Sequence, residues 1–268
     1  MIKLIASDLD NTLLGNDHKL HQEEIDAVLE AEEAGIRFVV ATGRDYHGAN
    51  AVVSGFGINC DYLLESGAEV RTATGKILHQ TPMSKDKIRE IYDVFYSRER
   101  PHTMMRLLGG VDHYCFGTED FVYRHVAYET RLFFDVPMNL SDRDTADLFF
   151  KNGNHRMNVS NSIEDVLAKV DTVSKIYLSS TKKDELKQLK EDMTKIDDID
   201  AASSFVNNLE ITDIHAQKGL VLARFADELG FSPDEVMIMG DSTNDYSMFD
   251  SNFGARVAVD NAMPVIKE

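Results

Sequence analysis

The 268-residue sequence predicts an α/β protein with a Rossmann-like parallel-sheet core and an inserted α/β domain. Apolar runs alternate with amphipathic helical patterns in the first and last thirds of the chain, an order typical of parallel sheets covered by helices. The middle of the chain instead begins with a helix and a hairpin signal, which indicates a separate unit. We therefore expect a core domain formed by residues 1–83 and 208–268, and an inserted domain formed by residues 84–207.

The first third contains three expected strands and one expected helix. Apolar residues form the runs 2–6, 36–41 and 62–64, which predict buried strands. Residues 22–34 place apolar side chains on one helical face, and Gly35 follows as a helix stop. This order predicts the first strands of the parallel sheet.

The last third repeats the same order. Apolar residues recur at helical spacing over 216–229, and the apolar run 236–239 predicts another buried strand. A polar stretch, 240–245, follows that strand directly, and residues 256–259 are expected to form a final strand. We expect these strands to join the sheet begun in the first third.

The inserted domain is expected to have its own sheet and helices. Ser84 is a suitable N-cap for its first helix, and Gly109-Gly110 between two apolar runs is a two-residue hairpin signal. Periodicity predicts helices over 84–98, 119–131, 163–170 and 186–193, and strands over 103–108, 111–116, 175–179 and 201–206.

Composition excludes several classes of partner. The chain has 46 acidic and 28 basic residues, a formal charge of −18, which argues against nucleic acid or an anionic membrane as a partner. We find no signal peptide and no apolar run of about 18 residues. The two cysteines, Cys60 and Cys115, are in no metal-ligand spacing. We expect a cytoplasmic protein that is a monomer or a weak homodimer.

Two aspartates follow the first expected strand. Side chains two residues apart on an extended segment point to one side, so Asp8 and Asp10 are expected to face a common point. That point lies at the carboxyl end of the strand, where open α/β sheets bind ligands. Close carboxylates repel unless a cation lies between them or one is protonated, and oxygen ligands suit Mg²⁺. The alternative is a polar turn formed by Asp10-Asn11.

Three further segments are expected at the same edge of the sheet. Thr42-Gly43 ends the second strand, Lys218-Gly219 opens a helix, and Asp241 to Asp245 follow a late strand. Because parallel strands bring their carboxyl ends to one edge, the four segments are expected to converge. Taken singly, each has a simpler interpretation: a strand-ending turn, a solvated lysine, or an acidic turn that caps a helix.

In this order the segments resemble the haloacid dehalogenase superfamily of phosphotransferases. They resemble most the Cof-like phosphatases, which carry a large α/β cap of type IIB between the second and third motifs. The resemblance covers essentially the whole chain. The matching strings are Asp8-Leu9-Asp10-Asn11-Thr12, Ala41-Thr42-Gly43-Arg44, Lys218-Gly219 and Gly240-Asp241-Ser242-Thr243-Asn244-Asp245.

The resemblance implies a role for each matching residue. Asp8 would be the nucleophile that forms an aspartyl-phosphate, and Asp10 the general acid and base. The implied Mg²⁺ ligands are Asp8, the backbone carbonyl of Asp10, and Asp241. Lys218 would be catalytic by balancing negative charge. The implied phosphate-binding residues are Leu9, Thr42, Gly43, Lys218 and Asn244, and the supporting residues are Thr12, Arg44 and Asp245.

The sequence departs from the family pattern at three places. Ser66-Gly67-Ala68 stands where many relatives have Asn-Gly-Ala, and Val257 to Ala262 differs from the usual Val-Ala-Met-Gly-Asn-Ala. The pattern also leads us to expect a further strand and helix after Glu268. These departures concern substrate contacts and carboxyl-terminal packing rather than the nucleophile.

The expected function is Mg²⁺-dependent hydrolysis of a small phosphorylated metabolite, a sugar phosphate by family analogy. A sugar phosphomutase is the main alternative, although the arginines of the inserted domain are scattered rather than clustered. A dehalogenase is disfavoured by Asp10, because that chemistry needs no acid for the leaving group. A non-catalytic phosphate-binding module would need no nucleophile at Asp8.

Overall fold

The computed structural model describes residues 1–15 and 17–268, which form two compact units, each with its own sheet. The core unit consists of Met1–Thr81, Ala202–Phe205 and Thr212–Glu268. The inserted unit consists of Pro82–Ala201 and Val206–Ile211. The chain therefore passes between the units beside residues 81, 201, 205 and 211.

The core unit contains a seven-stranded sheet in the order β13-β12-β1-β2-β3-β4-β5. The strands are β1 Leu4–Ser7, β2 Arg37–Ala41, β3 Asp61–Leu64, β4 Glu69–Arg71, β5 Ile77–Gln80, β12 Val236–Gly240 and β13 Ala255–Ala258. The five from β13 to β3 are parallel, which confirms the predicted α/β class, and β4 and β5 extend the sheet antiparallel. The sequence analysis missed β4 and β5, because both are short and β5 is mostly exposed.

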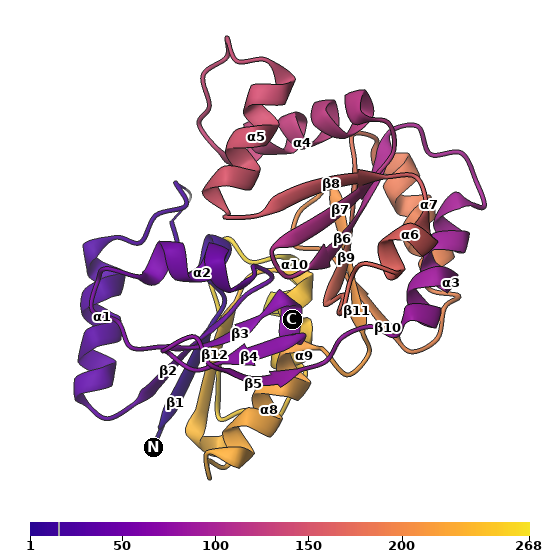
Figure 1. Cartoon of the computed structure of the whole chain (residues 1–268). Coiled ribbons are helices and arrows are strands. Elements are labelled where there is room, and N and C mark those ends of the chain that lie inside the picture. The colour runs from indigo at the N-terminus through magenta and orange to yellow at the C-terminus, as the bar shows by residue number, and fades with distance from the viewer. Residues whose placement is uncertain (16) are drawn as a thin grey trace. The chain divides into compact units, whose positions relative to one another are not determined.

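Helices cover both faces of the core sheet (Figure 1). Helices α1 (Gln22–Glu33) and α2 (Tyr46–Val53) share a hydrophobic cluster with Phe38 and Val40 of β2. Helix α8 (Lys218–Glu228) packs with Val39 and Ala41 on the opposite face. Successive strand residues point to opposite faces, so one apolar run serves both layers. The remaining helices are α9 Tyr246–Phe249, α10 Pro264–Lys267 and the short turns η1 Leu9–Leu13, η2 Glu65–Gly67, η3 Pro233–Glu235 and η4 Thr243–Asp245.

The strand order places the predicted motifs side by side. Strand β1 lies between β12 and β2, and its last residue, Ser7, is paired with Met239 and with Val40. The residues that follow these three parallel strands therefore leave the sheet at the same edge. Asp8, Asp241 and Thr42 are among them, as expected from the sequence.

The inserted unit contains a six-stranded sheet in the order β10-β11-β9-β6-β7-β8. The strands are β6 Thr103–Gly109, β7 Asp112–Phe116, β8 Arg156–Ser160, β9 Lys175–Ser180, β10 Ile199–Ala202 and β11 Asn208–Asp213. Helices α3 Lys85–Tyr96, α6 Ile163–Leu167 and α7 Lys183–Met193 share one apolar core with the sheet. Helices α4 Glu119–Phe133 and α5 Asp142–Asn152 share a second one.

Comparison with the expected elements gives agreements and corrections. Ser84 caps α3 by accepting the Lys87 N–H at 3.2 Å, as predicted. The hairpin also exists, but Gly109 pairs with Asp112, so the turn lies one residue later than expected. The strand expected over 201–206 is wrong, because β10 ends at Ala202. Helix α5 and strand β8 were missed, since neither has a clean apolar period.

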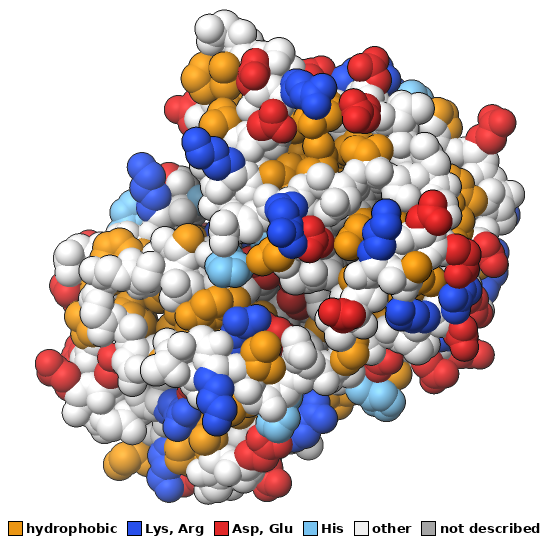
Figure 2. Space-filling model, viewed as in Figure 1, with side chains coloured by type: hydrophobic (Ala, Val, Ile, Leu, Met, Phe, Trp, Pro, Cys, Tyr) orange, Lys and Arg blue, Asp and Glu red, His pale blue; other side chains and the backbone are white. Residues whose placement is uncertain are grey.

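Charged side chains of both signs lie on the surface in view (Figure 2). Figure 2 shows Lys and Arg side chains scattered among acidic, polar and apolar ones on the face in view. Among the residues that the structure describes, no helix has the length and apolar character needed to cross a bilayer. A protein that binds the nucleic-acid backbone needs a concentrated basic surface, and the chain carries a formal charge of −18.

Candidate active site

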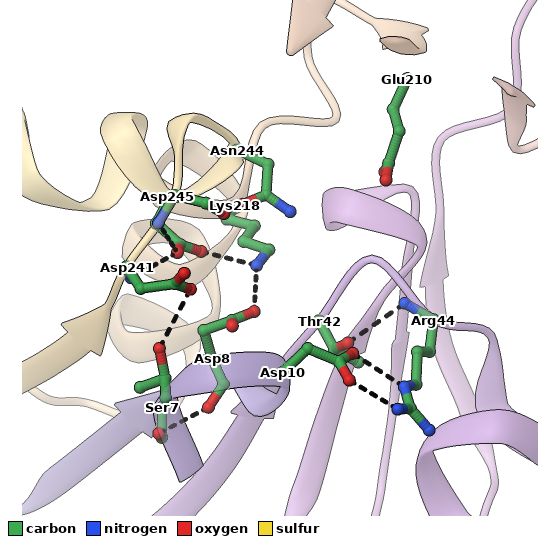
Figure 3. A network of polar contacts seen from close by, with 12 residues as sticks. Ser7, Asp8, Asp10, Thr42, Arg44, Glu210, Lys218, Asp241, Asn244 and Asp245 are labelled. Carbon is green, nitrogen blue, oxygen red and sulfur yellow. Dashed lines mark hydrogen bonds and ion pairs between the residues drawn. The ribbon is translucent and has the colours of Figure 1, made fainter. Parts of the chain in front are cut away.

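A fully buried lysine forms the centre of the site. The Nζ of Lys218 donates to Oδ1 of Asp8 at 2.7 Å and to Oδ1 of Asp245 at 2.6 Å (Figure 3). Burial lowers the pKa of Lys218, but the charges of Asp245 and Asp8 outweigh burial, and the net effect raises that pKa. Lys218 is therefore a permanent positive charge between two carboxylates.

Two glycines allow Lys218 to reach this position. A Cβ on Gly219 would overlap the backbone carbonyl of Ser247, so only glycine lets α8 approach α9 this closely. The Gly219 N–H donates to the Ser247 hydroxyl at 2.9 Å across the same contact. Gly67 has φ +109°, and a Cβ there would overlap the Ala216 carbonyl just before α8. The Lys-Gly string thus has a packing reason as well as a chemical one.

Asp245 organises the loop that follows β12. Its Oδ2 accepts the N–H groups of Asp241 at 3.0 Å and Ser242 at 3.1 Å, while its Oδ1 accepts Lys218. A Cβ on Gly240 would lie 2.7 Å from Oδ2 of Asp245, so glycine leaves room for this carboxylate. Both oxygens of Asp245 are therefore occupied by the protein.

Asp8 and Asp241 are the other carboxylates of the cluster. Burial, and then the charge of Asp245, raise the pKa of Asp8 well above its usual range, with Lys218 opposing the shift. Burial and Asp245 also raise the pKa of Asp241 to about 6, and the Thr12 hydroxyl, which donates to Oδ1 of Asp241 at 3.2 Å, opposes that shift. Negative charge in the cluster thus exceeds what Lys218 can balance.

The cluster fits a hard divalent cation. Asp8, Asp241 and Asp245 each offer a carboxylate oxygen, and these oxygens lie within 4.8 Å of one another. Among the described residues, the hydrogen bonds to Asp8 and Asp241 use only Oδ1 of each, which leaves each Oδ2 available. Because the donors are all oxygen and carry excess negative charge, the set suits Mg²⁺ better than a soft metal. Asp245, with both oxygens engaged, is better placed as support.

The Asp10 carboxylate does not join Asp8, Asp241 and Asp245 in the carboxylate cluster. Strand β1 ends at Ser7, and the chain then turns through Leu9–Leu13 with Asn11 at φ 60°, so strand geometry does not extend to Asp10. The expectation that the two aspartates face one point as strand neighbours is therefore wrong in this structure. Figure 3 shows the Asp10 carboxylate turned toward Arg44 and away from Lys218.

Arg44 holds the Asp10 carboxylate with two hydrogen bonds. Its Nε and Nη2 donate to Oδ2 and Oδ1 of Asp10 at 2.8 and 2.6 Å, and Nδ1 of His18 lies 3.7 Å from Oδ1. Burial raises the pKa of Asp10, but hydrogen bonds from His18 and Arg44 outweigh it, and the net effect lowers that pKa. Asp10 is therefore a carboxylate in this arrangement.

The remaining predicted residues lie at the same edge of the core sheet. Thr42 is buried, its N–H donates to the Leu63 carbonyl, and its hydroxyl accepts the Arg44 N–H at 3.1 Å, with Gly43 between them. Asn244 accepts the Ser242 hydroxyl at 2.6 Å through Oδ1. The Leu9 side chain is buried in an apolar cluster, so only its backbone can serve a phosphate.

The structure adds contacts that the sequence analysis missed. The Ser7 hydroxyl donates to the Asp8 carbonyl at 2.7 Å, and Nδ2 of Asn261 donates to the Asn11 carbonyl at 2.8 Å. Ser66 adopts φ 61°, a left-handed conformation, and its N–H donates to the Thr42 carbonyl. Ser66 and Asn261 lie in the two strings that depart from the family pattern, so the sequence did single out those positions. His18 and Ser7 match no sequence pattern, and nothing in the sequence pointed to their contacts.

Comparison with known proteins identifies the family. The family model described as haloacid dehalogenase-like hydrolase matches residues 5–268. The chain belongs to the haloacid dehalogenase-like hydrolase family. The solved structure of a haloacid dehalogenase-like hydrolase from B. subtilis is similar over 99% of this chain and 92% of that chain, with a TM-score of 0.82 and 26% identity.

Relatives of this hydrolase are named phosphatases. The chain is 25% identical over 267 residues to the 5-amino-6-(5-phospho-D-ribitylamino)uracil phosphatase YcsE of Bacillus subtilis (strain 168), covering 100% of this chain and 87% of that protein. It is 24% identical over 269 residues to the HMP-PP phosphatase of Yersinia pseudotuberculosis serotype O:1b (strain IP 31758), with the same coverage, 100% and 87%. The resemblance seen in the four motifs is thus confirmed at the level of the family, which makes this chain an enzyme of that family.

Proposed function

We propose that this hydrolase cleaves a small phosphomonoester, with Mg²⁺, through an aspartyl-phosphate on Asp8. The observation that carries the proposal is the buried Asp8 carboxylate at the end of β1, bound by Lys218 and close to Asp241. A carboxylate buried among other carboxylates is costly unless it serves chemistry or binds a cation. The relatives named as phosphatases support the same reaction class.

In the first step, Asp8 attacks the phosphorus atom. One oxygen of its carboxylate forms a new bond to phosphorus, and the bond between phosphorus and the leaving alkoxide breaks. The other oxygen stays with Lys218, which donates to Oδ1 in this structure, and would be the one that faces Mg²⁺. Lys218 compensates the charge that gathers on the phosphoryl oxygens while it stays protonated.

Asp10 is the proposed acid and base. After it has taken up a proton from solvent, it gives that proton to the leaving oxygen in the first step; as a carboxylate in the second step, it takes a proton from the water that hydrolyses the aspartyl-phosphate. Both of its oxygens accept from Arg44 in this structure, so the pair must open before Asp10 can reach a leaving group. We propose that a rotation of the Asp10 side chain away from Arg44 opens this pair.

The proposed Mg²⁺ ligands are Asp8, the backbone carbonyl of Asp10, and Asp241. When bound, the ion neutralises the repulsion between the nucleophile and the phosphoryl oxygens. The Thr42 hydroxyl, the Gly43 and Leu9 amides, and Asn244 are the proposed phosphate contacts, in addition to Lys218. Thr12 and Asp245 support the ligands by the hydrogen bonds described above.

The proposed substrate is a small phosphorylated polyol or sugar. One relative is named for a compound with a phosphorylated ribityl chain, which supports this class without fixing the compound. We propose that the inserted unit acts as a cap and contacts the leaving group, since the phosphate-handling residues all belong to the core unit.

The experiment is phosphate release from a panel of sugar and polyol phosphates, with Mg²⁺, with chelator, and with Mg²⁺ restored. We expect release that needs Mg²⁺ and returns when Mg²⁺ is restored. Formation of an isomeric sugar phosphate without phosphate release would indicate a phosphomutase. Phosphate binding without turnover of any ester would indicate a binding module and overturn the proposal.

A further inference from the structure

A short segment between β10 and β11 is bound to the loop that carries Asp241. Residues Ala202–Phe205 belong to the core unit, although the residues on both sides of them belong to the inserted unit. The Ser203 N–H donates to the Thr243 hydroxyl at 3.1 Å, and that hydroxyl donates to the Ser203 carbonyl at 2.7 Å. One side chain thus fixes the backbone of Ser203 in two directions.

Thr243 lies in the middle of the site loop. Two residues before it is Asp241, a proposed Mg²⁺ ligand, and two residues after it is Asp245, which binds Lys218. Its neighbour Ser242 uses its hydroxyl within the loop, on Asn244. Thr243 instead uses its hydroxyl on a segment that continues into the inserted unit at both of its ends. The loop is therefore hydrogen-bonded to a core-unit segment, and the backbone joins that segment to the inserted unit at both of its ends.

This connection has a mechanical consequence. Strands β10 and β11 are part of the inserted sheet, and Ser203 directly follows β10. Because the backbone joins Ser203 to β10 and two hydrogen bonds join it to Thr243, a displacement of those strands would be passed on to the loop that holds Asp241 and Asn244. Small shifts of side chains in a site that must align reacting atoms have large effects on rate.

We propose that the Ser203–Thr243 pair is a tether that makes the geometry of the phosphate site depend on the inserted unit. Thr243 is then a positioning residue, and this role rests on the proposed function. Turnover of a phosphomonoester whose leaving group contacts the inserted unit depends on the tether. Turnover of acetyl phosphate, with a minimal leaving group, does not. The tether therefore favours phosphomonoesters with larger organic groups over minimal acyl phosphates.

Three variants test the tether. Thr243→Val removes both hydrogen bonds at nearly constant volume, Thr243→Ser keeps both, and Ser203→Ala keeps the backbone groups that Thr243 binds. We measure kcat and KM for a responsive sugar or polyol phosphate and for acetyl phosphate. Loss of two hydrogen bonds is expected to lower kcat/KM of Thr243→Val for the larger ester about tenfold relative to acetyl phosphate. Thr243→Ser and Ser203→Ala are expected to keep the wild-type ratio.

Two results of these kinetic measurements would overturn the proposal of a tether. If Thr243→Val loses the same factor for both substrates, Thr243 only stabilises the loop. If the ratio and both rates are unchanged, Thr243 has no role. Amide hydrogen exchange gives a readout that needs no turnover: the Ser203 N–H should exchange faster in Thr243→Val than in Thr243→Ser. Equal exchange in the two variants would reject the tether, whether or not the wild-type enzyme hydrolyses an ester. Failure of the wild-type enzyme to hydrolyse any ester in the panel would reject the phosphatase proposal instead.

Discussion

Replacement of Lys218 by methionine tests whether this buried cation holds the acidic cluster together. Lys218 has no exposed surface, and its Nζ is 2.7 Å from Asp8 and 2.6 Å from Asp245. Methionine retains an unbranched apolar chain but removes the charge and both hydrogen bonds. Two buried carboxylates then remain close to each other and to Asp241 without a compensating cation.

The expected cost follows from this geometry. Removing one partner of a buried ion pair destabilises proteins by about 3–5 kcal/mol, because the other partner stays buried and unpaired. Lys218 serves two carboxylates, but Asp8 can take up a proton, since burial already raises its pKa. These effects oppose each other, so we expect the free energy of unfolding to fall by about 3–5 kcal/mol. Added Mg²⁺ should restore more stability to this variant than to the wild type, since it supplies positive charge to the same oxygens.

Urea unfolding of wild type and Lys218→Met, with and without Mg²⁺, measures this cost. Lys187→Met is a matched control, because Lys187 is exposed on α7, and its unfolding free energy should stay within about 0.5 kcal/mol of wild type. A change below about 1 kcal/mol in Lys218→Met would refute the argument that Lys218 compensates the cluster.

Two further predictions concern the scaffold. Burial lowers the pKa of His113 and His125 below the usual range, so the unfolded chain binds more protons than the folded chain on acidification. The free energy of unfolding should therefore fall as the pH falls below about 6.5. In urea unfolding between pH 7.5 and 5.5, a His113→Leu, His125→Leu variant should lose less stability on acidification than the wild type. An equal loss in both would contradict the claim that these two histidines cause the pH dependence. In Gly219→Ala, the new Cβ overlaps the Ser247 carbonyl, so we expect the protein to be destabilised by about 1–3 kcal/mol and phosphate release to be reduced. Wild-type stability and wild-type phosphate release in this variant would show that α8 and α9 separate freely.

The fold and the converging edge of the sheet were predictable from local patterns. Alternating strand and helix signals predicted a parallel sheet, and a parallel sheet brings Asp8, Thr42 and Asp241 to one edge whatever the lengths of the connections. The inserted unit was predicted less well, because α5 and β8 are partly polar and half exposed.

The partners within the site were less predictable than its location. Lys218 and Asp8 are 210 positions apart, and spacing alone does not pair them; the family resemblance supplied that expectation. The pairing of Asp10 with Asp8 failed because strand geometry was extended past Ser7 into a turn. The contact between Ser203 and Thr243 had no sequence signal, since it depends on the path of one short segment.

The most direct test of the account is the search for a phosphoryl group on Asp8. Enzyme mixed with a turned-over phosphomonoester and Mg²⁺, quenched in acid within a single turnover and digested, is analysed by mass spectrometry. We predict a phosphoryl adduct on the peptide that contains Asp8, and neither an adduct nor turnover in Asp8→Asn, since the amide cannot attack phosphorus. Steady turnover without this adduct, or Asp8→Asn activity above about one hundredth of the wild-type rate, would contradict the assignment of Asp8 as the nucleophile.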